Sequence, residues 1–141
     1  MRDIDAVTHD VIGVAMRLHS QLGPGLLESV YEALLAGRLI NMGFQVDRQM
    51  PINLDFDGMT FSEVARTDLL IDKRLVIEIK SVERFHPVHA KQLLTYLRLL
   101  DLPVGLLINF GEAKLKDGIR RLVNNHIDSP SSASSAPLRE T

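Results

Sequence analysis

The sequence contains no cysteine and no tryptophan, and aromatic residues make up only 5% of its 141 residues. Without cysteine the chain cannot form disulfides, use a thiol as nucleophile, or hold zinc or an iron–sulfur cluster through thiolates. The acid–base groups and metal ligands that remain are carboxylates, histidine and lysine. These absences exclude disulfide-stabilised folds, thiol enzymes and Cys-ligated metal centres.

Long apolar runs and a strong excess of one charge are also missing. No apolar stretch approaches the roughly 20 residues that a membrane-spanning helix needs, and the first ten residues, MRDIDAVTHD, lack the apolar core of a signal peptide. We therefore expect no membrane association and a cytoplasmic location. With 16 Lys and Arg against 18 Asp and Glu the net charge is -2, so any contact with nucleic acid must be local.

The composition is that of a globular protein, with 45% hydrophobic and 24% charged residues, and the length suits a single domain. We expect this domain to span residues 1–124. Residues 125–141 are rich in serine and proline, and the stretch DSPSSASSAP at 128–137 offers almost nothing to bury. The sequence therefore predicts a disordered tail at 125–141.

Two helices are predicted in the first third of the chain. Apolar residues recur every three or four positions over 4–22, with Asp3 placed as N-cap. Gly23-Pro24-Gly25 then interrupts the helix, because proline lacks an N–H and restricts the residue before it. The same spacing resumes over about 26–42, and Gly43 is well placed to end that helix.

The chain after Gly43 changes to strand patterns. We expect strands over 44–49, 52–56, about 60–71, 74–80 and 104–110, a turn at Asp57-Gly58, and a helix over 87–100. The strand–helix–strand order from 74 to 110 needs a crossover connection, so its two strands should be parallel. The predicted fold class is α/β in a single domain: a helix, a mixed four-to-five-stranded sheet, a helix and a strand, with an extra N-terminal helix.

The strand RLVIEIK at 74–80 carries two charged residues where burial is expected. Period-two alternation places Glu78 and Lys80 on one face of this strand. If residues 72–74 form a three-residue turn, Asp68 of the preceding strand lies opposite Glu78; a two-residue turn would place Thr67 there instead. Two opposed carboxylates repel unless a divalent cation binds between them. The ordinary explanation of E-x-K on a strand is a solvent-facing ion pair, so the motif alone is weak.

These residues resemble a known family. Asp68, followed after nine residues by Glu78-Ile79-Lys80, is similar to the core of the PD-(D/E)XK nuclease superfamily. Within it the sequence resembles the GxxExxY branch, whose signature is present as Gly25-Leu-Leu-Glu28-Ser-Val-Tyr31. The stretches at 22–32, 66–70, 86–97 and 104–111 also look like that branch, so the resemblance covers about 7–124.

The resemblance implies a restriction-endonuclease-like fold and a set of roles. Asp68 and Glu78 match the carboxylates that hold Mg²⁺ or Mn²⁺, and Lys80 matches the lysine that positions or deprotonates the attacking water. Glu28 can complete the metal shell in related nucleases, and Gln92 occupies a place often used to support the active site. Thr67 stands where the superfamily name has proline.

Several of these residues also have a plain structural explanation. Glu28 suits the first turn of a helix in any case, and Gln92 is compatible with a surface amide. Tyr31 is expected in the core. We expect His86 and His89 to belong to a helix start, with metal or phosphate binding as the less favoured alternative, and His19 to be structural.

Positive charge is concentrated after the candidate site. Residues 80–121 contain eight bases and four acids, whereas residues 1–79 contain seven bases and twelve acids. This distribution favours a phosphate-bearing partner, although the same bases would also suit a solvated last helix.

Three functions are compatible with these observations. The first is a Mg²⁺- or Mn²⁺-dependent nuclease that hydrolyses phosphodiester bonds in DNA or RNA. The alternative is a binding or regulatory module with this fold, for nucleic acid, nucleotide or a protein partner, with little or no turnover. A purely structural role leaves the opposed carboxylates unexplained. The small size favours the binding module, because nucleases of this superfamily usually gain specificity from extra domains or dimerisation, and this chain has little beyond the core. The intact Asp68, Glu78 and Lys80 favour the nuclease, and a homodimer is compatible with both.

Overall fold

The computed structural model describes residues 2–125, and the tail predicted to be disordered lies almost wholly outside the described residues. Its elements follow the chain in this order: α1 (Ile4–Leu22), α2 (Glu28–Asn41), β1 (Val46–Phe56), β2 (Met59–Ile71), β3 (Leu75–Lys80), α3 (Pro87–Leu100), β4 (Val104–Asn109), the 3₁₀ helix η1 (Leu115–Gly118) and β5 (Ile119–Val123).

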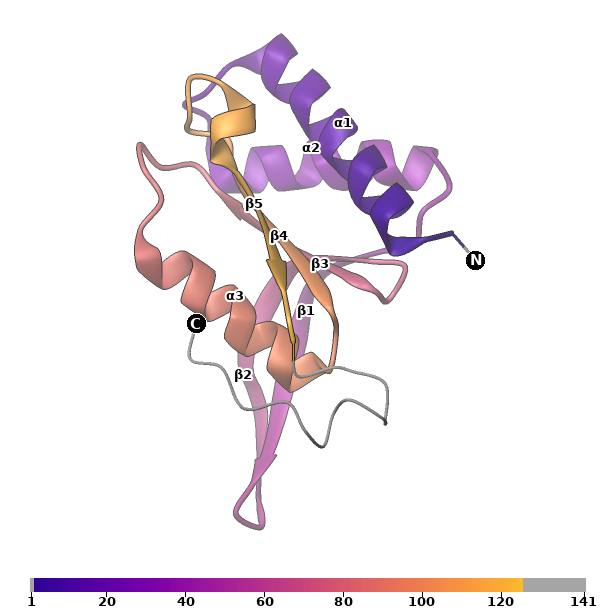
Figure 1. Cartoon of the computed structure of the whole chain (residues 1–141), viewed down its shortest axis with the longest axis vertical. Helices are drawn as coiled ribbons and strands as arrows, with labels where there is room; N and C mark the ends of the chain where they lie inside the picture. The colour runs from indigo at the N-terminus through magenta and orange to yellow at the C-terminus, as the bar shows by residue number, and fades with distance from the viewer. Residues whose placement is uncertain (1, 126–141) are drawn as a thin grey trace.

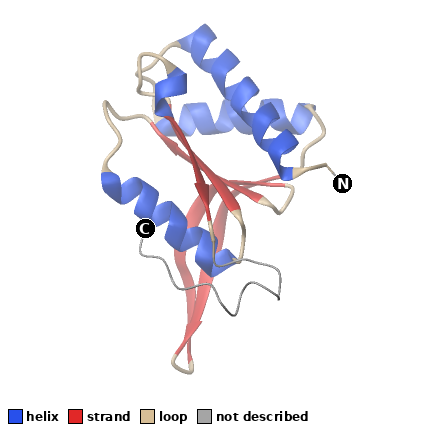
Figure 2. Cartoon of the chain, in the orientation of Figure 1, coloured by secondary structure: helices blue, strands red, loops and turns tan. Residues whose placement is uncertain are grey.

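The five strands form one mixed sheet in the order β1-β2-β3-β4-β5. Only β3 and β4 are parallel, and α3 connects them; the other neighbours are antiparallel. Helices α1 and α2 cover one face of the sheet and α3 covers the other (Figures 1 and 2). The expected α/β single domain, with a mixed sheet and a parallel strand–helix–strand unit, is confirmed.

The main core lies between the sheet and α1 and α2. It contains Val7, Val11 and Leu18 of α1, with Leu35 and Leu39 of α2. A smaller core lies between the sheet and α3. Asp3 caps α1 as expected, because its Oδ1 accepts a hydrogen bond from the Asp5 N–H at 3.1 Å. In the described part of the chain, no helix is long and apolar enough to cross a membrane.

One strand prediction was wrong in detail, and one strand was not predicted. The segments 44–49 and 52–56 form one continuous strand, β1, which runs through Pro51. A proline is tolerated there because β1 is an edge strand of the sheet, where one side of the backbone needs no partner. Residues 119–123 form the edge strand β5 rather than a last helix, because they pair with the buried strand β4. Tertiary pairing decides the structure of such a short segment.

Candidate active site

The turn between β2 and β3 sets the register that the sequence predicts. Asp72 and Lys73 both adopt left-handed dihedrals, with φ of 51° and 57°, and Ile71 pairs with Leu75. The backbone ladder continues as far as the pair of Leu69 and Ile77. The next opposed residues are Asp68 and Glu78, as expected for a three-residue turn.

Side chains continue the pairing where the ladder of β2 and β3 ends. The Asp68 N–H donates to Glu78 Oε2 at 2.8 Å, and the Ile79 N–H donates to Asp68 Oδ2 at 2.7 Å. Each carboxylate is thus hydrogen-bonded to the backbone of the opposite strand. This arrangement keeps two carboxylates next to each other.

Glu78 is 5% exposed, and its carboxylate pairs with no cationic side chain among the described residues. Burial raises the pKa of Glu78 from 4.5 to about 8, with a further contribution from the negative charge of Asp68. Lys80 acts in the opposite direction and does not cancel this effect. Between residues 2 and 125, neither Asp68, Glu78 nor Lys80 takes part in a salt bridge within 4.0 Å. The solvent-facing E-x-K ion pair is therefore not what the structure contains.

A hydrogen-bond network extends from Asp68 to α2. Gln49 donates through Nε2 to Glu32 Oε1 at 2.7 Å and to Asp68 Oδ1 at 3.2 Å. Glu32 is buried and forms a salt bridge with Arg48 at 3.1 Å. Gln49 adopts a φ of 51°, which interrupts the regular alternation of β1. The amide of Gln49 thus holds two carboxylates from two other elements.

Neither Glu32 nor Gln49 was identified from the sequence as part of the site. Glu32 follows Glu28 by four residues, so the helical repeat could have placed both on related faces of α2. Gln49 carried no comparable signal, because its place opposite Asp68 depends on the pairing register of β1 with β2.

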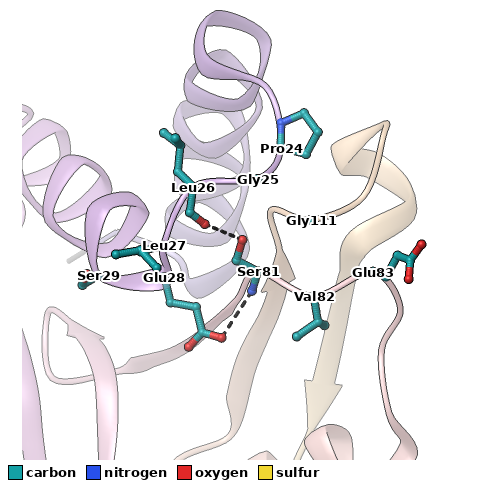
Figure 3. A pocket seen from close by; sticks show the side chains of 10 residues that line it. All are labelled: Pro24, Gly25, Leu26, Leu27, Glu28, Ser29, Ser81, Val82, Glu83 and Gly111. Atoms are coloured by element: carbon teal, nitrogen blue, oxygen red, sulfur yellow. Dashed lines mark hydrogen bonds between the residues drawn. The ribbon is translucent and has the colours of Figure 1, made fainter.

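Glu28 is the first residue of α2 and lies beside the residue that follows Lys80. Its Oε2 accepts from the Ser81 N–H at 3.4 Å, and the Ser81 hydroxyl donates to the Leu26 carbonyl at 2.6 Å (Figure 3). Across the described ranges, no group of three or more His, Asp or Glu side chains is arranged to hold a metal. Glu28 is therefore not gathered with Asp68 and Glu78 into a three-carboxylate cluster.

Tyr31 fixes the loop that leads into α2. It is fully buried, its ring stacks on Phe110 with centroids 4.3 Å apart, and its hydroxyl donates to the Gly23 carbonyl at 2.6 Å. The same hydroxyl accepts from the Leu26 N–H at 3.2 Å. The signature tyrosine therefore has a core role and positions the Gly-Pro-Gly loop.

A pocket of about 670 Å³ opens between this loop and the ends of β3 and β4 (Figure 3). The residues that line it are Pro24, Gly25, Leu26, Leu27, Glu28, Ser29, Ser81, Val82, Glu83 and Gly111. The side chain of buried Asn109 holds two of these lining residues in place. It forms hydrogen bonds of 2.9–3.0 Å with the N–H and the carbonyl of Val82 and with the N–H of Gly111. The residues flanking Lys80 are thus held in place.

Helix α3 brings polar groups toward the carboxylate pair. Desolvation raises the pKa of Tyr96, with further contributions from the charges of Glu78 and Asp68, while a hydrogen bond with Gln92 acts in the opposite direction. Gln92 therefore contacts Tyr96, whose pKa depends on the charges of Asp68 and Glu78. Desolvation, followed by the charge of Lys80, lowers the pKa of His89.

His86, His89 and His19 have structural partners. His89 Nδ1 accepts from the His86 N–H at 3.3 Å, so these two residues form the start of α3 as expected. His19 Nε2 donates to the Glu112 carbonyl at 2.8 Å, which agrees with a structural role.

Comparison with known proteins identifies the family. A family model described as the PD-(D/E)XK nuclease superfamily matches residues 5–122. The chain belongs to this superfamily. No curated protein matches it. A solved structure titled "Crystal structure of SSO0001" aligns over 84% of this chain with 19% identity and a TM-score of 0.40; the chain spans 64% of that protein's length.

PD-(D/E)XK nucleases generally use divalent metals, and the carboxylate pair fits such an ion. Asp68 and Glu78 supply hard oxygen donors, and Glu78 is buried with no salt bridge to residues 2–125, so a bound ion would supply a counter-charge. Magnesium sites commonly use only one or two protein carboxylates, with waters and substrate phosphate as the other ligands. The absence of a three-ligand group among residues 2–125 is compatible with this type of site.

Proposed function

We propose that the chain is a divalent-metal-dependent nuclease of the GxxExxY branch that hydrolyses phosphodiester bonds in DNA or RNA. The observation that carries this proposal is the pair of adjacent carboxylates, Asp68 and Glu78, each held by the backbone of the other's strand. A purely structural pair would gain nothing from burying a carboxyl group at the expense of a strongly raised pKa.

Asp68 and Glu78 are the residues proposed to hold Mg²⁺ or Mn²⁺. When bound, the ion supplies positive charge that acidifies a water and stabilises charge on the phosphate. Lys80 is on the same strand face as Glu78 by alternation, and its ammonium group is suited to orient the attacking water and to stabilise developing negative charge. In hydrolysis the water oxygen bonds to phosphorus, the bond to the leaving oxygen breaks, and that oxygen receives a proton.

Glu28 and Gln92 are proposed to support this site from two helices. Glu28 bonds to Ser81 next to Lys80, which places its carboxylate near the end of β3. Gln92 interacts with Tyr96 on the helix that faces Glu78. The excess of bases over residues 80–121 supports nucleic acid as the partner. Separately from the activity, we propose a cytoplasmic location and a homodimeric state.

The test is a titration of Mg²⁺ and Mn²⁺ into the wild type and into Asp68→Ala, with calorimetric detection of metal binding. The same samples are assayed for cleavage of single-stranded DNA, double-stranded DNA and RNA. We expect the wild type to bind metal and to cleave at least one substrate, and Asp68→Ala to do neither. Asp55→Ala, which removes an exposed carboxylate of the distal β1–β2 hairpin, is the matched control.

The two measurements separate two failures. Metal binding by the wild type without cleavage of any substrate would overturn the proposed nuclease activity and favour a binding module. The absence of metal binding would overturn the metal site itself.

A further inference from the structure

Helix α2 is apolar on both sides. Its buried side packs on the sheet, as expected for a helix in a layered fold. Its outward side would ordinarily carry charged and polar residues. Instead, this side exposes Leu27, Val30, Ala33, Leu34, Gly37 and Ile40. Leu27 is 73% exposed and Ile40 is 53% exposed, so the uncovered face extends along the whole helix.

No packing contact within the described part of the chain requires a glycine at position 37. It lies in the interior of α2, where glycine destabilises a helix relative to alanine. A Cβ added at Gly37 would meet no atom of residues 2–125 within 4 Å. With Ala33 one turn earlier, Gly37 leaves a shallow depression on an otherwise bulky apolar face. The depression would allow the backbone of another helix to approach closely.

We propose that this face of α2 packs against α2 of a second copy of the chain, antiparallel and about a twofold axis. In that arrangement Val30 fits over Gly37 of the partner subunit, and Leu34 lies against Ala33 of the partner subunit. Leu27 at one end then meets Ile40 of the partner subunit at the other end. Each large residue meets a small one near the axis, so the face is complementary to itself, as a twofold interface requires.

The dipoles of the two helices favour this orientation. An antiparallel pair opposes the two helix dipoles, whereas a parallel pair would align them. Arg38 is the single basic residue of α2, and its guanidinium donates to Gln21 Oε1 of α1 at 2.6 Å, which disfavours nucleic acid as the occupant.

The expected dimer is one of moderate affinity. A helix of 14 residues is about 21 Å long, and two such helices bury less surface than a large obligate interface. The inference depends only on the surface of α2, so it stands or fails independently of the proposed nuclease activity.

Analytical ultracentrifugation of the full chain over a wide concentration range tests the dimer. The wild type should change from monomer to dimer as concentration rises, and the Val30→Gln, Leu34→Gln double variant should stay monomeric. Val88→Gln, at a residue of α3 that is 52% exposed on the other side of the sheet, should behave as the wild type. A wild type that is monomeric at every concentration would overturn the proposal.

Gly37→Gln separates the interface from folding. The free space around Gly37 accepts the new side chain in the monomer, so the melting temperature measured on dilute, monomeric protein should stay equal or rise. The same side chain would fill the depression and should abolish dimerisation. A Gly37→Gln protein that dimerises like the wild type would show that the contact lies elsewhere.

The absence of cysteine permits a direct test by cross-linking. Ala33→Cys places one thiol near the proposed axis, where oxidation should yield a covalent dimer that a reductant reverses. Val88→Cys provides a matched thiol away from the axis and should remain largely monomeric. Equal cross-linking of the two variants would contradict the assignment of the interface to α2.

Discussion

Asp68 and Glu78 are linked through backbone groups rather than through each other's charges. The Asp68 N–H donates to the Glu78 carboxylate, and the N–H of Ile79, next to Glu78, donates to the Asp68 carboxylate. These bonds hold together two groups that would repel if both were ionised, and the pKa of Glu78 is accordingly raised to about 8 by burial and by the charge of Asp68. A bound ion would favour the ionised form of Glu78 and relieve this cost.

Replacing Asp68 with Asn should leave the metal-free protein as stable as the wild type or more stable. Asn keeps an oxygen to accept from the Ile79 N–H, and no salt bridge of Asp68 within residues 2–125 is lost. It gives up the 3.2 Å bond from Gln49, and the removal of the Asp68 charge beside Glu78 offsets that loss. Thermal melts with and without Mg²⁺ check this, and the variant should lose the stabilisation by Mg²⁺. A loss of several kcal/mol without metal would instead indicate a structural role, as expected when a buried cation loses its partner.

The stability of the metal-free protein should fall as pH rises from about 4.5 to about 8. In this window the unfolded chain has lost the Glu78 proton while the folded protein retains it, because burial and Asp68 raise the pKa of Glu78 to about 8. When the pKa of a group differs by one between the folded and unfolded states, the free energy of unfolding changes by about 1.4 kcal/mol, so the total effect is on the order of several kcal/mol. Denaturant unfolding at a series of pH values measures it.

Glu78→Gln supplies the comparison for that pH series. The amide cannot ionise, so this variant should lack the Glu78 contribution to the slope and should exceed the wild type in stability at pH 8. Saturating Mg²⁺ should also reduce the slope of the wild type, because the ion favours the ionised carboxylate. Glu83→Gln changes an exposed carboxylate nearby and should leave the slope unaltered. Identical slopes in wild type and Glu78→Gln would contradict the raised pKa.

The core of the site was predictable because it depends on local rules. The turn at 72–74 and the two-residue repeat of a strand were enough to place Asp68 opposite Glu78, and the observed pairing of Leu69 with Ile77 confirms that register. The parallel pairing of β3 with β4 followed from the helix between them in the same way.

The parts that were missed depend on contacts between distant segments. Gln49 lies between Arg48 and Met50, whose partners Leu69 and Thr67 flank Asp68, and this register between distant segments is encoded by no apolar repeat. Residues 119–123 become a strand because β4 offers an edge, not because their own pattern demands it. The bond from Ser81 to Glu28 likewise depends on how α2 meets the end of β3.

Gln49→Met should weaken metal binding more than it weakens the fold. Methionine keeps the length of the side chain but removes the donor shared by Glu32 and Asp68, so Asp68 loses a group that orients its carboxylate. Loss of such outer hydrogen bonds commonly costs about 10-fold or more in metal affinity, and the lost hydrogen bonds should cost about 1 kcal/mol of stability. Calorimetric titration with Mn²⁺ and denaturant unfolding measure the two effects.

Gln45→Met is the control for Gln49→Met, because Gln45 is an exposed glutamine that lies just before β1. It should bind Mn²⁺ like the wild type. If Gln49→Met lost stability but kept full metal affinity, the hydrogen bonds from Gln49 to Glu32 and Asp68 would stabilise the fold without contributing to metal binding.

Tyr96 should report the charge of the carboxylate pair. The chain has only two tyrosines and no tryptophan, so subtracting the titration of a Tyr96→Phe variant isolates the absorbance change of Tyr96. Desolvation and the charges of Glu78 and Asp68 raise its pKa, so Glu78→Gln and Asp68→Asn should each lower its titration midpoint. Circular dichroism at the same pH values verifies that the protein stays folded. Glu63→Gln, on the distal hairpin, should leave the midpoint unchanged, and an equal midpoint in all four proteins would show that Tyr96 does not sense the pair.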